Sequence, residues 1–137
     1  MSATSQPVRA SEVMSSHVRV ADPHLGLDRV SEMLAEEHCH HIPVVDGGRP
    51  VGMISSRDLV RVAHERGHPR LDSELLAKLV AEDVMSSEVE TIYVDDSVDI
   101  AIERIGRGDI HALVVLDADD QLAGIVTHRD LLHYLTR

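Results

Sequence analysis

One stretch of seven residues occurs twice in this chain. Gly52-Met53-Ile54-Ser55-Ser56-Arg57-Asp58 returns as Gly124-Ile125-Val126-Thr127-His128-Arg129-Asp130. A second pair of strings, Glu12-Val13-Met14-Ser15 and Asp83-Val84-Met85-Ser86, is offset by 71 residues (85 − 14), whereas the glycines are offset by 72 (124 − 52). We therefore expect one structural unit written in two copies, with one residue gained inside the second hairpin.

Each copy is expected to hold a short extended segment, a helix, two strands and a second helix. Apolar residues with helical spacing mark the first helices, at Leu27, Val30, Met33 and Leu34 in copy one and at Val98, Ala101, Ile102 and Ile105 in copy two. Capping groups precede the helix of copy two at residues 96–99, whereas residues 23–26 offer few in copy one.

The two strands of each copy are recognised as apolar runs joined by turn residues. Residues 42–45 and 51–54 flank the turn 46–50, and residues 113–116 and 122–126 flank the turn 117–121. The second helix of each copy is expected to face the core with three apolar residues. These are Leu59, Val62 and Ala63 in copy one, and Leu131, Leu132 and Leu135 in copy two. The first of these should end at Gly67-His68-Pro69, and a linker helix is expected within residues 70–81.

Composition excludes several classes of function. The chain has 137 residues, and its 43% apolar content suffices for one ordinary core or two half-size units that share one. Phe and Trp are absent and the net charge is −11, so neither stacking platforms nor phosphate attraction favours nucleic acid. The apolar runs are far shorter than the roughly 18 residues of a membrane span. Residues 1–7 lack an apolar signal-peptide stretch, so we expect a cytoplasmic protein with no membrane partner.

The repeated polar string has a local and a functional interpretation. Ser55 or Thr127 at the N-cap of a helix, with Asp58 or Asp130 three residues later, has the spacing of a capping box. A single such pair would usually be only a cap. Here it occurs twice at matched points, each time after a strand that contains Gly, which allows close approach to the backbone. The free N–H groups of a helix N-terminus also suit a phosphate, and the carboxylate suits a sugar diol.

At this point the residues resemble a known family, the tandem pair of cystathionine-β-synthase (CBS) domains called a Bateman module. The matching marks, which span residues 10–135, are Val13-Met14 and Val84-Met85, His41-Ile42-Pro43-Val44-Val45-Asp46, and the two Gly-x-x-Ser/Thr-x-x-Asp strings with Leu after the Asp. The resemblance implies an α/β (α+β) fold of two βαββα repeats packed about a pseudo-twofold axis, with small sheets flanked by helices. It divides the chain into a flexible N-terminus (1–9), repeat 1 (10–66), a linker with a short helix (67–80) and repeat 2 (81–137).

The same resemblance implies a ligand and a site. Family members commonly bind AMP, ADP, ATP, S-adenosylmethionine or NAD in the clefts between the copies, and they usually form dimers of pairs. By similarity Asp58 and Asp130 would hold ribose hydroxyls, and Ser55 and Thr127 would contact phosphate. The base would be flanked by Val20, Ala21, Ile42 and Pro43 in copy one, and by Ile92, Tyr93, Leu113 and Val114 in copy two. Arg57 and Arg129 could neutralise phosphate, although solvated surface positions suit them slightly better.

Potential metal ligands are densest at His38, Cys39, His40 and His41. Structural zinc usually takes four ligands as two separated pairs, and no second pair of that kind is present, so a solvated turn is the favoured interpretation. No nucleophile elbow, P-loop or zincin helix is present either. We therefore expect no catalytic cofactor and no enzyme activity.

Three functions stay open. The first is a stand-alone regulatory module that binds an adenine nucleotide and signals to an unknown effector protein, with a homodimer as the expected assembly. The second is a ligand-free dimerisation scaffold in which both strings only cap helices. The third is a metal- or redox-responsive protein that uses the cluster at residues 38–41.

Overall fold

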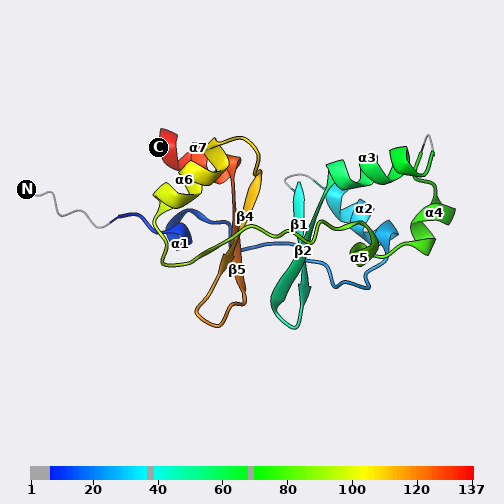
Figure 1. Cartoon of the computed structure of the whole chain (residues 1–137), viewed down its shortest axis with the longest axis horizontal. Helices are drawn as coiled ribbons and strands as arrows, with labels where there is room; N and C mark the ends of the chain where they lie inside the picture. The colour runs from blue at the N-terminus through cyan, green and yellow to red at the C-terminus, as the bar shows by residue number, and fades with distance from the viewer. Residues whose placement is uncertain (1–6, 37–38, 68–69) are drawn as a thin grey trace, which may run out of the picture. The chain divides into compact units, whose positions relative to one another are not determined.

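The chain folds into two compact units, and neither of them coincides with one sequence repeat. The continuous unit spans Val18–Val89, and the split unit combines the residues up to His17 with Glu90–Arg137. The computed structural model describes residues 7–36, 39–67 and 70–137 (Figure 1). The expected flexible segment 1–9 falls mainly outside these residues, but Pro7, Val8 and Arg9 are described.

The continuous unit is a β-hairpin accompanied by four helices. Its elements are α2 (Leu27–Ala35), β1 (His41–Asp46), β2 (Arg49–Ser55), α3 (Ser56–Glu65), α4 (Ser73–Lys78) and α5 (Ala81–Val84). The strands are antiparallel, with Ile42 opposite Ile54 and Asp46 opposite Arg49. Gly47 and Gly48 form the turn with φ of 59° and 86°, a backbone region that glycine adopts without steric cost. The short extended segment of this copy is reduced to one parallel bridge between Ala21 and Val44.

The split unit repeats this plan with a complete third strand. Its elements are α1 (Ala10–Val13), β3 (Thr91–Tyr93), α6 (Val98–Gly106), β4 (Ala112–Leu116), β5 (Leu122–Thr127) and α7 (His128–Thr136). The strand order is β3-β4-β5, with β3 parallel to β4 and β4 antiparallel to β5. The mixed α/β class and the small helix-flanked sheets that the sequence predicted are therefore confirmed.

The register of the hairpins confirms the single extra residue. Each hairpin has a bulge at the same place, after Val44 in β1 and after Val115 in β4. Val45 pairs with Pro50 in the first hairpin, and Leu116 pairs with Leu122 in the second. Four residues lie between the first pair and five between the second, so the offset between the copies changes from 71 to 72 inside the turn.

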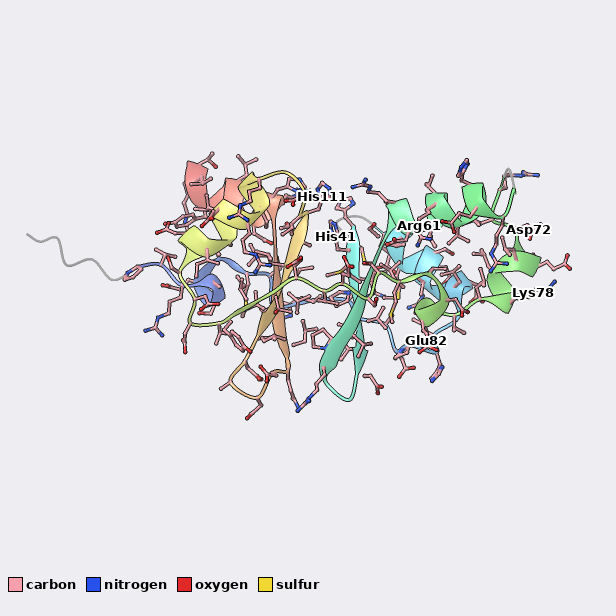
Figure 2. The ribbon with its side chains drawn as sticks, in the orientation of Figure 1. His41, Arg61, Asp72, Lys78, Glu82 and His111 are labelled. Carbon is pink, nitrogen blue, oxygen red and sulfur yellow. The ribbon has the colours of Figure 1, made fainter. Side chains whose placement is uncertain are left out.

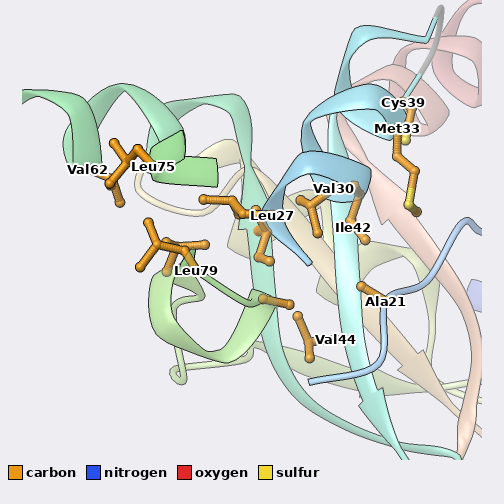
Figure 3. Close-up of a cluster of buried hydrophobic side chains, with 13 residues drawn as sticks. Ala21, Leu27, Val30, Met33, Cys39, Ile42, Val44, Val62, Leu75 and Leu79 are labelled. Atoms are coloured by element: carbon orange, nitrogen blue, oxygen red, sulfur yellow. The ribbon is translucent and has the colours of Figure 1, made fainter. Parts of the chain in front are cut away.

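Each unit has its own apolar core. In the continuous unit, Leu27, Val30 and Met33 from α2 pack with β1 and with Val62 of α3 (Figure 3). In the split unit, Val98, Ala101 and Ile105 from α6 pack with Leu113, Val115 and Val126. Full burial of one Leu, Ile or Val side chain contributes about 1.5–3 kcal/mol, so these clusters supply the main driving force for each unit. The inward stripes expected for the two first helices are confirmed.

The helix ends follow the capping residues. Ser97 accepts a hydrogen bond from the Asp99 amide at the start of α6, whereas Gly26, before α2, has no side chain to do so. The linker helix is confirmed as α4, where Asp72 Oδ1 accepts a hydrogen bond from the Leu75 amide. Helix α3 ends at Glu65, and Gly67 follows with a φ of 67°. The rest of the expected stop signal, His68-Pro69, lies outside the described residues.

The inward face predicted for α7 is wrong in two of its three residues. Leu131 is buried, but Leu132 and Leu135 are 59% and 61% exposed. The core contact is made instead by Leu131 and Tyr134, which lie three residues apart on one face. The predicted inward face was based on the leucines alone and left out Tyr134. It therefore placed the wrong side of α7 against the core.

The short helices α1 and α5 join the unit built mainly from the other sequence repeat. Ala10 is completely buried in the core of the split unit, and its amide donates to the Asp96 carbonyl oxygen at 2.7 Å. Ala81 is completely buried in the continuous unit, and its amide donates to the Leu25 carbonyl oxygen at 2.8 Å. Each short helix thus packs in the unit that contains most of the other sequence repeat, so α1 and α5 are exchanged between the two units. Within the described residues, no helix has the length and apolar character needed to cross a bilayer.

Candidate functional site

The repeated polar strings lie at the junction of a strand with a helix in both units. Strand β2 ends at Ser55, which is the N-cap of α3, and β5 ends at Thr127, which is the N-cap of α7. Both N-cap residues have extended backbone geometry before the helix begins. The sequence prediction of two N-caps, each with an acid three residues later, is therefore confirmed.

One oxygen of each acid is committed to the helix cap. The Ser55 amide donates to Asp58 Oδ2 at 2.7 Å, and the Thr127 amide donates to Asp130 Oδ2 at 2.9 Å. The hydroxyl groups of the same N-cap residues lie 3.3 Å and 3.2 Å from these oxygens. Each carboxylate is thus held in place at the helix N-terminus, where the helix dipole favours negative charge.

The other oxygen of each acid has a different partner in the two units. Asp58 Oδ1 lies 3.5 Å from Nη2 of Arg61, a side chain that is labelled in Figure 2. The same guanidinium nitrogen donates to the Val84 carbonyl oxygen at 3.0 Å. Asp130 Oδ1 accepts a hydrogen bond from the Ser15 hydroxyl at 2.8 Å. The sequence analysis assigned neither partner, although the three-residue spacing of Asp58 and Arg61 on one helix is a signal for the first. His133 takes the place of Arg61 in copy two, and Ser15 is 115 residues from Asp130.

The glycine of each string is explained by packing within the protein. A Cβ atom on Gly52 would lie 2.2 Å from Met85 Sδ and 3.0 Å from the Ser86 carbonyl oxygen. A Cβ atom on Gly124 would lie 2.6 Å from Met14 Sδ and 2.7 Å from the Ser15 carbonyl oxygen. The expected close approach to the backbone is present, but the approaching group is the exchanged Val-Met-Ser segment. These two repeated motifs therefore fit together.

The remaining predicted residues lie on the same strands or near them. Arg57 and Arg129 are exposed in the first turn of α3 and of α7. The Ala21 amide donates to the Pro43 carbonyl oxygen at 3.0 Å, next to Ile42, and Val20 is 42% exposed. In the split unit Ile92 is paired with Val115 beside Leu113 and Val114. The side chains of Ala21, Ile42, Pro43, Ile92, Leu113 and Val114 are buried, so these residues would offer mainly backbone atoms to a ligand.

Tyr93 is the exception among the predicted base-flanking residues, because its side chain is 46% exposed. Its hydroxyl donates to Asp120 Oδ1 at 2.7 Å. This hydrogen bond, together with the negative charge of Asp120, raises the pKa of Tyr93. The tyrosine is held at the β4–β5 turn rather than left free to reorient.

The cluster at residues 38–41 is only partly described. Cys39 is buried, and this burial raises the pKa of its thiol, an effect that nearby Glu36 adds to and Arg19 opposes. His40 is exposed, His41 begins β1, and His38 lies outside the described residues. Over the parts of the chain that are described, no three His, Cys, Asp or Glu side chains gather as metal ligands.

Comparison with known proteins identifies the family. The CBS domain model matches residues 10–65 and 80–137, so the chain belongs to the CBS domain family and carries two of its domains. A CBS domain-containing protein from Bacillus anthracis is similar over 95% of this chain and 94% of its own, with 25% identity and a TM-score of 0.83.

Two further similar structures were solved with ligands. The CBS domain pair of protein MJ0100, in complex with 5-methylthioadenosine and S-adenosyl-L-methionine, has 23% identity and a TM-score of 0.77 and covers 95% of this chain and 97% of its own. CBSX2 in complex with AMP has 22% identity and a TM-score of 0.77 and covers 93% of this chain and 95% of its own. At these identities the likeness establishes the shared fold.

The first curated relatives are longer proteins. Three of them share 26–28% identity with this chain over 122–129 residues, and the chain spans 40%, 23% and 23% of their lengths. Two of the three are named homoserine O-acetyltransferase. In those enzymes the similar region is therefore a minor part of the whole protein.

Proposed function

We propose that this CBS domain pair is a regulatory, non-catalytic module that binds an adenosine-containing ligand, with AMP, ADP or ATP favoured over S-adenosylmethionine or NAD. The observation that carries the proposal is the pair of half-buried acids, Asp58 and Asp130, each fixed through Oδ2 at a helix N-terminus. A carboxylate fixed in this way is a preorganised acceptor for ribose hydroxyls. The choice of ligand class is supported by the adenosine-containing molecules in the complexes of MJ0100 and CBSX2.

The neighbouring groups suit the rest of such a ligand. Helix α3 has 10 residues and α7 has 9, and the N-terminus of each provides backbone N–H groups and a favourable dipole for phosphate. Ser55 and Thr127 would contact phosphate, and Arg57 and Arg129 would neutralise it. The base would lie against Val20, Ala21, Ile42 and Pro43 in one site, and against Ile92, Tyr93, Leu113 and Val114 in the other.

We further propose that the module acts as a homodimer and transmits its ligand state to an effector protein. Val60 on α3 and Leu132 on α7 occupy equivalent positions of the two copies and are 69% and 59% exposed. Exposed apolar side chains on a helix are suited to an interface between copies. Light scattering on the purified protein measures this assembly directly.

The ligand-free scaffold is the second candidate, and the capping bonds favour it. Acids three residues after the N-cap accept the N-cap amide at two other helices as well, where Glu12 accepts from Arg9 at 2.7 Å and Asp83 accepts from Val80 at 2.9 Å. Helices α1 and α5 have four residues each, so these acids serve as local caps. The same role for Asp58 and Asp130 would require no ligand.

Replacing both acids with asparagine separates the two functions. An asparagine carbonyl oxygen can still accept the N-cap amide, but it lacks the charge and the second acceptor oxygen that hold a diol. Ligand at 100 times its Kd adds about 2.7 kcal/mol to the stability of the folded state. We therefore expect AMP, ADP or ATP at millimolar concentration to raise the Tm of the wild-type protein by several degrees, and expect no such rise in the Asp58→Asn/Asp130→Asn variant.

The control is the Tm of the double variant without ligand, which should lie close to that of the wild type. Thermal unfolding followed by circular dichroism gives both quantities. The ligand function would be abandoned if no adenosine compound among AMP, ADP, ATP, S-adenosylmethionine and NAD raised the Tm. A ligand-induced rise that survived in the double variant would instead refute the assignment to these two acids.

A further inference from the structure

The N-terminal strap, residues 8–15, runs from the start of α6 to the acid of the second site. The Val8 carbonyl oxygen accepts from the Val98 amide at 2.8 Å, and the Ala10 amide donates to the Asp96 carbonyl oxygen. At the other end Ser15 and Ile125 exchange two backbone hydrogen bonds of 2.9 and 3.0 Å, which adds the strap to the edge of β5. The Ser15 side chain then reaches Asp130.

A count of acceptor positions shows what the Ser15 hydroxyl does there. An ionised carboxylate has about four lone-pair positions, two on each oxygen. On Asp130, Oδ2 takes the amide and the hydroxyl of Thr127, and Oδ1 takes the hydroxyl of Ser15. These three hydrogen bonds from the described residues leave one position, whereas a ribose diol that donates both hydroxyl groups needs two. A bidentate grip on the diol therefore requires one present donor to leave, and the candidates with rotatable hydroxyl groups are Thr127 on Oδ2 and Ser15 on Oδ1.

Ser15 is the donor on Oδ1, the oxygen that the helix cap leaves to a ligand. The Thr127 amide is an N-terminal helix donor that would otherwise lose its partner, whereas the Ser15 side chain is exposed and its hydroxyl can turn to water. In the continuous unit, Oδ1 of Asp58 has Arg61 Nη2 at 3.5 Å, an ion pair that is longer than a usual N–H···O hydrogen bond. The two acids thus differ in how freely they can accept a diol.

We propose that the N-terminal strap is an autoinhibitory element of the second site, with Ser15 occupying the acceptor oxygen that the ligand needs. The inference rests on the proposed function and adds its regulation. Ligand binding at Asp130 competes with the Ser15 hydroxyl, so the second site binds more weakly than it would without that hydroxyl. Turning the Ser15 hydroxyl away from Asp130, with the rest of the strap kept in the core, strengthens ligand binding at this site and leaves the Asp58 site as it was.

Site-resolved NMR titration with AMP tests the competition in the full-length chain. The amides of Ser55, Ser56 and Arg57 report on the first site, and those of Thr127, His128 and Arg129 report on the second. Loss of one hydrogen bond that competes with the ligand should strengthen binding by about three- to tenfold. We expect Ser15→Ala to lower the AMP Kd of the second site by this factor and to leave the Kd of the first site unchanged.

Two matched variants complete the design. Ser86→Ala removes the equivalent hydroxyl of the other copy, which lies in the continuous unit, and should leave the Kd of the second site unchanged. Ser15→Thr keeps a hydroxyl at the same place and should bind AMP at the second site as the wild type does.

The outcomes separate this inference from the function on which it rests. If AMP shifts the amides of both sites but Ser15→Ala leaves the Kd of the second site unchanged or raises it, the autoinhibitory role of Ser15 is overturned while the ligand function stands. If AMP shifts the amides of neither site, the proposed function itself fails, and the inference fails with it.

Discussion

Gly52 and Gly124 make room for packing within the protein, at positions where the sequence pattern favoured the approach of a ligand. A Cβ atom on Gly124 would meet Met14 Sδ, which can move, and the Ser15 carbonyl oxygen, which is fixed by its hydrogen bond from Ile125. The backbone contact at 2.7 Å is shorter than real Cβ contacts. The strap or β5 would therefore have to shift to admit even one methyl group.

We expect Gly124→Ala to lower the free energy of unfolding by about 1–3 kcal/mol, the usual cost of overpacking a close contact. Urea unfolding followed by circular dichroism measures this loss. Gly106→Ala is the control, because Gly106 lies in α6 with nothing within 4 Å of its added Cβ. Alanine there should keep the stability or raise it by up to about 1 kcal/mol. Equal effects of the two changes would contradict the packing role of Gly124.

The acids at the two helix starts could be recognised at the residue scale, but their surroundings could not. An N-cap and an acid three residues later are a local pattern, and the hydrogen bonds of Ser55 with Asp58 and of Thr127 with Asp130 follow from it. The contact of Ser15 with Asp130 joins residues that no local pattern relates. Such a contact depends on where the strap lies after folding.

At the scale of elements, the exchange of α1 and α5 is the feature that most alters the meaning of the sequence repeat. Helix α1 belongs to copy one by sequence, yet its hydrogen bonds and its buried Ala10 contribute to the split unit. The stability of residues 90–137 therefore depends on a segment about 80 residues earlier in the chain.

Ala10→Asp tests this dependence. Placing a charge at a fully buried position without a partner should cost at least about 2 kcal/mol of folding free energy. Amide hydrogen exchange should show the loss of protection mainly in residues 90–137, and less in residues 18–89. Ala77→Asp, on the exposed face of α4, serves as the control and should cost less than about 0.7 kcal/mol. Loss of protection confined to residues 18–89 would refute the exchange.

Helices and hairpins were largely predictable because their signals are local. The stripe of α6, the cap of α4 and the turn at Gly47-Gly48 each depend on residues within one element or one turn. The inward face of α7 was not predicted correctly, because Leu131, Leu132 and Leu135 are equally apolar and only packing decides which of them is buried. Tertiary contacts chose Leu131 and Tyr134.

At the scale of the whole molecule, Cys39 links folding to pH. Burial holds the pKa of its thiol above the ordinary value of 9.0. Below that pH both the folded and the unfolded chain keep the proton, so ionisation of Cys39 leaves stability unchanged. Above it the unfolded chain releases the proton more readily than the folded protein, and unfolding is favoured. Stability due to Cys39 is therefore present at pH 7 and is lost as the pH rises above 9.

The comparison of wild type with Cys39→Ala isolates this effect from other groups that titrate in the same range. We expect the wild type to be more stable than the variant at pH 7, by about 1 kcal/mol for the lost packing of a small buried side chain. This advantage should shrink at pH 10. Urea unfolding at both pH values gives the two differences, and an unchanged advantage at pH 10 would show that the folded state does not disfavour the thiolate.

The sequence by itself determined the two-copy plan, the order of helix, two strands and helix within each copy, the turns, and the capped acids at the starts of α3 and α7. Each of these depends on hydrogen bonds and apolar spacing over a few residues, which are present wherever the chain folds. Only the tertiary structure decided that α1 and α5 are exchanged between the two units and that methionines lie against Gly52 and Gly124. It also decided that the Ser15 hydroxyl donates to Asp130. Those contacts join residues far apart in the chain, and their free energy exists only once both partners are packed into the same unit.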